Sequence, residues 1–317
     1  MAATNREMQR LIGLAFAPTT HLAYDQGIRV FLQFCTDHSI PHNWPFTSLT
    51  IAHFVAFMSI TGKSVSTVRT YLAGIGASHK IHGWSDPTNS FLVSKLLKGL
   101  ARDSKTQDTR YPITVDRLEQ MVNCLPVICT SHFEAVLFKA AFTLSYFGCL
   151  RVSELLGQAP SVVAKGGRKG LSVKDVLSTM PQVVFRLNGS KTDQNAVGRI
   201  VTLRPVTSPA VVCPVTSLAD YLTKRPGSAG ALLARPGTSG PLLVHQNSTP
   251  VTRYQFQAVI KKAAFHLGWP HTRYSSHSFR IGAATTAALR GDPEEDIMAL
   301  GGWKSTAFRG YCRPDKV

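Results

Sequence analysis

Residues 132–147, HFEAVLFKAAFTLSYF, constrain the fold more than any other segment of the chain. If the segment is helical, apolar side chains lie on nearly every face, and a helix of that kind is buried on all sides. A domain must therefore be built around it. Helical spacing of apolar residues recurs in 114–123, 211–224, 252–267 and 277–290, with shorter helices expected near 294–300 and 305–311.

In the same region, two segments do not show the helical spacing of apolar residues. Residues 182–187, QVVFRL, and 199–203, RIVTL, are rich in branched side chains and are typical of strands. The polar stretch between them, NGSKTDQNAVG, is expected to be a hairpin loop. We therefore predict a mainly α fold with a small β-sheet for this part of the chain.

The first third of the chain is predicted to be entirely helical, with helices at 19–39, 47–60, 65–81 and 90–101. On 65–81 one apolar face is expected, with polar residues on the others. The apolar face consists of Val68, Leu72 and Ile75, and the residues placed elsewhere are Arg69, His79 and Lys80. The polar segment 102–112, RDSKTQDTRYP, ends in proline and is the best linker. The sequence thus predicts a helical domain at 1–103, a linker at 104–112 and a second domain at 113–317.

The chain has 317 residues, of which 44% are hydrophobic, and this is enough for two cores. Lys and Arg number 35 against 18 Asp and Glu, which gives a net charge of +17. Residues 1–105 carry +5 and the remainder +12, so both domains are basic. Such an excess favours a polyanionic partner, most commonly nucleic acid. Composition alone fits a solvated basic surface equally well.

Several function classes find no support. No apolar run is long enough to span a membrane, and the first ten residues, MAATNREMQR, do not resemble a secretory signal. Six scattered cysteines without a CxxC pair favour reduced thiols and an intracellular location.

Metal and nucleotide sites are not expected either. Cys124, Cys129 and His132 are close in sequence, but no second ligand pair follows at zinc spacing. Gly62-Lys63-Ser64 resembles the end of a phosphate-binding loop, yet residue 57, where the first glycine is required, is phenylalanine. The sequence therefore predicts no cofactor.

Arg151 follows one of the most apolar stretches of the chain. A guanidinium buried there is costly unless an anion meets it, and a phosphate would bind it bidentately. The alternative is an ion pair with Glu154, three residues later. Considered alone, Arg151 favours that alternative.

The segment SSHSFRIGAATTAALRG is predicted to form a helix capped by Ser275 or Ser276. His277 and Arg280 are three residues apart, so they share one face of the first turn, where the free amides and the helix dipole also favour an anion. The alternative is a surface histidine and arginine near a cap. Further along, Trp303 precedes Tyr311 by eight residues, and each by itself is typical of core packing.

The ordered set is more specific than any of its members. An arginine, a lysine in a hairpin, His-x-x-Arg, a tryptophan and a tyrosine resemble the active-site motif of the tyrosine recombinase (phage integrase) family. The matching residues are Arg151, Lys191, His277, Arg280, Trp303 and Tyr311. HSFRIGAATTAA, SKTDQ and GGWKSTAFRGY are most similar to the recombinases of DIRS-like eukaryotic mobile elements. A tryptophan before the tyrosine is similar to the Cre-like active sites.

The resemblance covers nearly the whole chain and implies its function. It implies a helical core-binding (SAM-like) domain followed by a tyrosine recombinase catalytic domain, acting on double-stranded DNA as a tetramer on paired sites. Tyr311 would attack the phosphate to form a 3′-phosphotyrosine, and Lys191 would protonate the leaving 5′ oxygen. Arg151, Arg280, His277 and Trp303 would bind the phosphate oxygens. Neither a metal nor a nucleotide is implied, and a eukaryotic host would place the protein in the nucleus.

Three alternatives remain at this point. The chain could be a domesticated or truncated recombinase that only binds DNA, a type IB topoisomerase that uses the same chemistry, or an interaction protein that does not bind DNA. Arg69 and Lys80 are the DNA contacts that we expect in the first domain. Six residues follow Tyr311, and they leave open how copies of the chain assemble.

Overall fold

The computed structural model describes residues 1–103, 108–158, 163, 170–178, 180–187, 198–227 and 240–317. These residues divide into two compact units, an N-terminal unit up to Asp108 and a C-terminal unit from Thr109 to Val317. Part of the predicted linker, 104–107, lies outside the described residues. None of the helices in the described part of the chain is long and apolar enough to cross a membrane.

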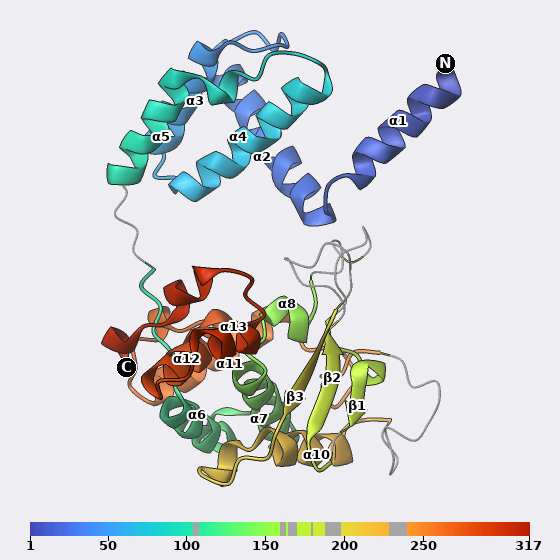
Figure 1. Cartoon of the computed structure of the whole chain (residues 1–317), viewed down its shortest axis with the longest axis vertical. Helices are drawn as coiled ribbons and strands as arrows, with labels where there is room; N and C mark the ends of the chain where they lie inside the picture. The colour runs from blue at the N-terminus through green and yellow to red at the C-terminus, as the bar shows by residue number, and fades with distance from the viewer. Residues whose placement is uncertain (104–107, 159–162, 164–169, 179, 188–197, 228–239) are drawn as a thin grey trace. The chain divides into compact units, whose positions relative to one another are not determined.

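The N-terminal unit is helical throughout its described length (Figure 1). Its elements are α1 (Ala2–Leu14), α2 (Pro18–Asp37), α3 (Ser48–Ile60), α4 (Val65–Ile81), the 3₁₀ helix η1 (Pro87–Asn89) and α5 (Phe91–Asp103). The four predicted helices are confirmed, within a few residues at their ends. Helix α1 was not predicted, although Met8, Leu11 and Ile12 stand at helical spacing in it, and none of its residues is buried.

Helices α2 and α4 approach each other closely because each presents a glycine to the other. A Cβ at Gly27 would lie 2.6 Å from the Cα of Tyr71, and a Cβ at Gly74 would lie 2.8 Å from the Cα of Tyr24. Both distances are too short for any real side chain, so these two positions require glycine. This close packing sets the orientation of α4 against α2, and therefore the side of α4 on which Arg69 lies.

The position of His79 corrects the sequence analysis. It is fully buried, on the same face as Ile75 one turn earlier, rather than on a polar face. Its Nε2 accepts a hydrogen bond from the amide of Phe46 (3.1 Å), and its Nδ1 lies 2.8 Å from the carbonyl oxygen of Ile75. A histidine whose two nitrogens are both satisfied can be buried like an apolar residue.

The C-terminal unit is built around α7, as the sequence predicts. Its helices are α6 (Val115–Ile128), α7 (His132–Phe147), α8 (Val152–Leu155), α10 (Pro214–Lys224), α11 (Arg253–His266), α12 (Ser276–Leu289) and α13 (Glu294–Gly301). Short 3₁₀ helices are η2 (Val173–Asp175), η3 (Ala210–Val212), η4 (His271–Arg273), η5 (Thr306–Tyr311) and η6 (Pro314–Lys316). Helix α7 packs against α6, α10 and α12.

A small antiparallel sheet completes the C-terminal unit (Figure 1). Its strands, in the order β1-β2-β3, are β1 (Val176–Ser178), β2 (Val183–Leu187) and β3 (Arg199–Leu203). Leu187 pairs with Arg199 at the end of the β2–β3 ladder. The predicted fold class, mainly α with a small β-sheet, is confirmed, although β1 was not predicted.

The segment after the unit boundary runs along α12. The amide of Tyr111 donates to the carbonyl of Arg273 (2.9 Å), and the amide of Ile113 donates to that of Ser278 (3.0 Å). Gly282 allows this approach, because a Cβ there would overlap the backbone of Ile113. Helix α12 is thus covered on one side by this segment, and its other contacts form the candidate active site.

Candidate active site

Helix α12 supplies the central residues of the site. Ser275 caps it, with its hydroxyl accepting from the amide of His277, so the sequence prediction of a serine cap is confirmed. His277 is half-buried in the first turn, and Arg280 is fully buried on the following turn. The phenyl ring of Phe279 packs against those of Phe142 on α7 and Phe256 on α11, and this fixes the rotation of the helix.

Arg280 is held by two backbone carbonyls from distant segments. Its guanidinium donates to the carbonyl oxygen of Cys149, after α7, and to that of Gly301, at the end of α13, over 2.5 and 2.7 Å. Cys149 has a positive φ of 45°, which is uncommon outside glycine and turns its carbonyl in this tight connection. Burial lowers the pKa of Arg280 from its ordinary value. The guanidinium is therefore oriented before any ligand binds.

Two aromatic rings, those of Trp303 and Tyr311, lie against this guanidinium. Its central carbon lies 4.1 Å from the ring centre of Trp303 and 5.4 Å from that of Tyr311. The rings of Trp303 and Tyr311 are 5.0 Å apart, and those of His277 and Tyr311 are also 5.0 Å apart. The structure therefore brings together His277, Arg280, Trp303 and Tyr311, which the sequence spreads over 35 residues.

Two buried donors of this cluster have no hydrogen-bond partner within the described part of the chain. They are the Nε of Arg280 and the indole Nε1 of Trp303. Buried polar groups are nearly always satisfied, because leaving one unpaired costs about 1–3 kcal/mol. An anion bound at this cluster is the kind of ligand that such donors would satisfy. These donors are the clearest mark of a ligand in the C-terminal unit.

Arg151 lies close enough to act electrostatically on Arg280. It caps α8, and its guanidinium donates to the carboxylate of Glu154 over 2.8 Å, while its backbone amide donates to the other oxygen of the same carboxylate. The ion pair that the sequence offered as the alternative is therefore formed. Because only 21% of the Arg151 side chain is exposed and Glu154 is almost fully buried, the pair orients the guanidinium rather than leaving it in solvent.

Comparison with known proteins identifies structures with a similar fold but no significantly similar sequence. No protein-family model matches the chain, and no curated protein sequence is significantly similar to it. Among solved structures, it is similar to XerH site-specific recombinase bound to difH substrate in a pre-cleavage complex, with 15% identity over 92% of this chain and 77% of that one and a TM-score of 0.61. The chain has the tyrosine recombinase fold.

Two further solved structures share this fold. The Tn1549 transposon integrase in complex with circular intermediate DNA matches with 17% identity, a TM-score of 0.60 and coverage of 93% of this chain and 89% of that one. A lambda integrase dimer bound to a COC′ core site matches with 14% identity, a TM-score of 0.56 and coverage of 97% and 75%. Both units of the chain are thus included in the match.

Sequence reasoning missed Arg199, the first residue of β3. Its guanidinium donates to the carbonyls of Leu300 (3.1 Å), Ala299 (3.4 Å) and Gly148 (3.4 Å), so it ties the recombinase sheet to the ends of α13 and α7. Burial lowers its pKa, as for Arg280. Its only sequence signal is an arginine that opens an otherwise apolar strand. Lys191 lies between β2 and β3, in residues 188–197, and falls outside the described residues.

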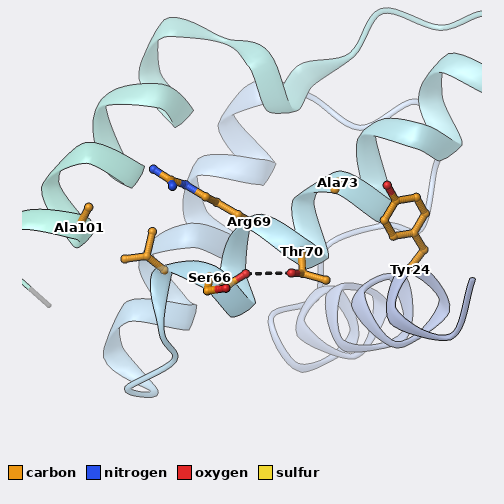
Figure 2. Close-up of a pocket in the computed structure, with 7 residues that line it drawn as sticks. Tyr24, Ser66, Arg69, Thr70, Ala73 and Ala101 are labelled. Atoms are coloured by element: carbon orange, nitrogen blue, oxygen red, sulfur yellow. Dashed lines mark hydrogen bonds between the residues drawn. The ribbon is translucent and has the colours of Figure 1, made fainter. Parts of the chain in front are cut away.

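The two expected DNA contacts of the N-terminal unit differ in their surroundings. Arg69 is exposed and lines a cavity of about 640 Å³ with Tyr24, Ser66, Thr70 and Ala101, on α2, α4 and α5 (Figure 2). Lys80 instead forms an ion pair with Asp86 (2.9 Å). Burial raises the pKa of Asp86, but hydrogen bonds from Thr88 and Lys80 outweigh this and lower it overall. Lys80 is therefore already engaged in an ion pair within the N-terminal unit.

The described residues contain no group of three histidine, cysteine or acidic side chains arranged to bind a metal. All six cysteines are free thiols. Burial raises the pKa of Cys124 to about 11 and that of Cys129 to about 12, so both are protonated at neutral pH.

Proposed function

We propose that the chain is a site-specific DNA recombinase or integrase, in which Tyr311 cuts and rejoins strands through a 3′-phosphotyrosyl intermediate. One observation carries this proposal. The ring of Tyr311 lies against Arg280 and Trp303, and each of these holds a buried donor that lacks a partner among the described residues. A nucleophile beside a preformed oxyanion site is the arrangement that attack on a phosphate requires.

The charge and burial of the cluster suit a phosphodiester. Its negative charge repels nucleophiles, and further charge develops on the non-bridging oxygens as the phosphorus becomes pentavalent. Arg280 and Arg151 offset that charge, and their orienting bonds to carbonyls and to Glu154 are already made. Groups fixed in a buried site do not reorganise during the reaction, and this makes their electrostatic contribution larger than in water. His277 and Trp303 add hydrogen-bond donors.

The step exchanges one phosphodiester for another. The Tyr311 oxygen attacks phosphorus, the bond between phosphorus and the 5′ oxygen breaks, and the 5′ oxygen leaves with a proton that we assign to Lys191. The tyrosine proton passes to solvent or to His277. Rejoining reverses the step with a 5′-hydroxyl as nucleophile, so the covalent bond stores the energy of the broken strand. The side chains alone supply this chemistry.

Double-stranded DNA is the proposed substrate, bound by both units. The net charge of +17 supports this, as does the exposed Arg69 beside the cavity of the N-terminal unit. The similar Tn1549 protein is described in complex with circular intermediate DNA, the XerH protein bound to difH substrate, and the lambda protein as a dimer bound to a COC′ core site. We propose that this chain likewise assembles on paired sites, as a tetramer. On its motifs, it belongs with the DIRS-like recombinases, and in a eukaryotic host it would act in the nucleus.

The proposal is tested by trapping the covalent intermediate. The protein is incubated with nicked suicide substrates made from the DNA that flanks its own gene, in the presence of a chelator, and adducts that survive denaturing gel electrophoresis are counted. We expect an adduct to the 3′ end, formed without a divalent metal. Failure to form it on any flanking sequence that the protein binds would leave a DNA-binding module as the function.

The same assay distinguishes a type IB topoisomerase. That class acts as a monomer, so it would relax supercoiled plasmid and form adducts at single sites without pairing. We expect instead that recombinant products require two sites on the DNA. Relaxation without any dependence on paired sites would favour the topoisomerase over the recombinase.

A further inference from the structure

The backbone around Tyr311 is fastened to α12 by one buried hydroxyl. Thr285 is fully buried on α12, and its Oγ1 accepts a hydrogen bond from the amide of Arg313 over 3.0 Å. The same oxygen lies 3.2 Å from the carbonyl of Tyr311 and 2.7 Å from the carbonyl of Ile281. Its single proton can serve either carbonyl, while the bond from Arg313 remains in both cases.

The other contacts of this segment in the described structure are made mainly by its side chains: the Tyr311 ring packs against those of His277 and Trp303, and the Arg313 guanidinium donates to the carbonyl of Arg110 (2.8 Å). Tyr311 ends the short 3₁₀ helix η5, in which Phe308 is the buried residue. A 3₁₀ helix has poorer hydrogen-bond geometry than an α-helix, so contacts with neighbouring elements contribute to its position. The neighbouring Cys312 thiol contributes one weak bond, to the carbonyl of Ala284 (3.7 Å). The Thr285 hydroxyl differs from these contacts because it meets the backbone itself, at the carbonyl of Tyr311 and the amide of Arg313.

The anchor and the phosphate-binding residues belong to the same helix. His277 and Arg280 lie eight and five residues before Thr285 on α12, and the ring of Tyr311 returns to contact both. The distance between nucleophile and phosphate therefore depends on one rigid element. Displacement of a reacting group by about 1 Å can slow a reaction by about 100-fold.

We infer that Thr285 is a positioning residue for the nucleophile. Its hydroxyl holds the Tyr311–Arg313 backbone in register with His277 and Arg280, so that the tyrosine oxygen faces the phosphate. The catalytic part of this inference rests on the proposed function, whereas the anchoring part rests on the geometry alone. Thr285 itself does not touch the reacting atoms.

A matched pair of substitutions tests it. Thr285→Val removes the hydroxyl and keeps the shape of the side chain, and Thr285→Ser restores the hydroxyl. Thr286→Val is the control, because Thr286 is the next residue of α12 and its hydroxyl accepts instead from Tyr146 on α7 (2.9 Å). We expect Thr285→Val to slow adduct formation by about 10- to 100-fold, with Thr285→Ser and Thr286→Val close to the parent protein.

Two further measurements separate positioning from a loss of fold. DNA affinity and its salt dependence should not change in Thr285→Val. On a substrate with a 5′-bridging sulfur, whose leaving group needs no proton, Thr285→Val should remain slow, because its defect lies in the attack. Recovery on that substrate, or an equal defect in Thr286→Val, would overturn the positioning role.

Hydrogen exchange tests the anchor without any activity. In the full-length protein free of DNA, amides of the peptide that contains Cys312 and Arg313 should exchange faster in Thr285→Val than in the parent protein or in Thr286→Val. Unchanged exchange would overturn the anchor. If the parent protein forms no adduct, the proposed function fails, and the exchange result still decides the anchor. If the parent protein is active and Thr285→Val matches it, only the positioning role fails.

Discussion

Arg280 in the C-terminal unit and Arg69 in the N-terminal unit bear the same functional group in opposite surroundings. Arg280 is fully buried, bonded to two carbonyls and stacked on Trp303. Arg69 is exposed at the rim of an open cavity (Figure 2). A guanidinium held by protein carbonyls has one orientation and suits chemistry at a defined atom, whereas a solvated one adapts to a polyanion and is screened by salt. Substitutions should therefore affect rate in one unit and affinity in the other.

The largest difference is expected for the nucleophile. Tyr311→Phe removes one hydroxyl and little volume, so the ring still packs against Trp303 and His277. The covalent adduct should disappear, while DNA affinity and folding stay close to those of the parent protein. Denaturing gels and a binding titration measure the two. An adduct that persists would remove Tyr311 from the role and make Tyr274 and Tyr254 the next residues to test.

Lys191→Ala should come next, because a general acid contributes about 10²- to 10⁴-fold. Cleavage should slow without vanishing, since the tyrosine and both arginines remain. A substrate with a better leaving group at the 5′ position should restore much of the rate. Single-turnover cleavage of the two substrates provides the measurement. An equal defect on both would assign the acid elsewhere, with His277 as the first candidate.

Arg280→Lys sharpens the contrast between the two arginines. A lysine cannot donate to the carbonyls of both Cys149 and Gly301 while also facing the phosphate, so the preformed geometry is lost. Removal of one oxyanion donor typically costs about 10²- to 10³-fold in rate. We expect a loss of that size in adduct formation, with weaker thermal stability measured by circular dichroism. A lysine variant with the parent rate would show that orientation is unimportant here.

Arg69→Ala should have a smaller effect than these substitutions, and an effect of a different kind. It should weaken DNA binding uniformly across sequences and reduce the slope of log affinity against log salt by about one. The cleavage rate at saturating DNA should not change. Lys80→Ala should do less still, because Lys80 is already paired with Asp86. Fluorescence anisotropy at several salt concentrations measures both. A rate defect in Arg69→Ala at saturation would break the division between the two units.

Most of the local structure of this chain follows from short-range pattern. Helix α7 begins and ends where its apolar run predicts, and α4 spans the predicted residues 65–81. The serine cap of α12 and the pair of Arg151 with Glu154 are contacts within three residues, and a sequence shows such contacts directly. Helix α1 was missed although its apolar residues have helical spacing, and none of them is buried in the structure, whereas strand β1 is only three residues long.

The candidate active-site residues were proposed from the sequence, but their arrangement depends on the tertiary structure. Arg280 is oriented by the carbonyl of Cys149, 131 residues away, and Arg199 reaches Leu300 across 101 residues. Thr285 can anchor the backbone beside Tyr311 because the chain after η5 returns to α12, where the amide of Arg313 donates to the Thr285 hydroxyl. Backbone carbonyls and amides are the same in every residue, so the sequence cannot mark which of them will orient a buried arginine. Periodicity and capping determine the elements, and long-range packing determines which polar groups they leave facing Tyr311.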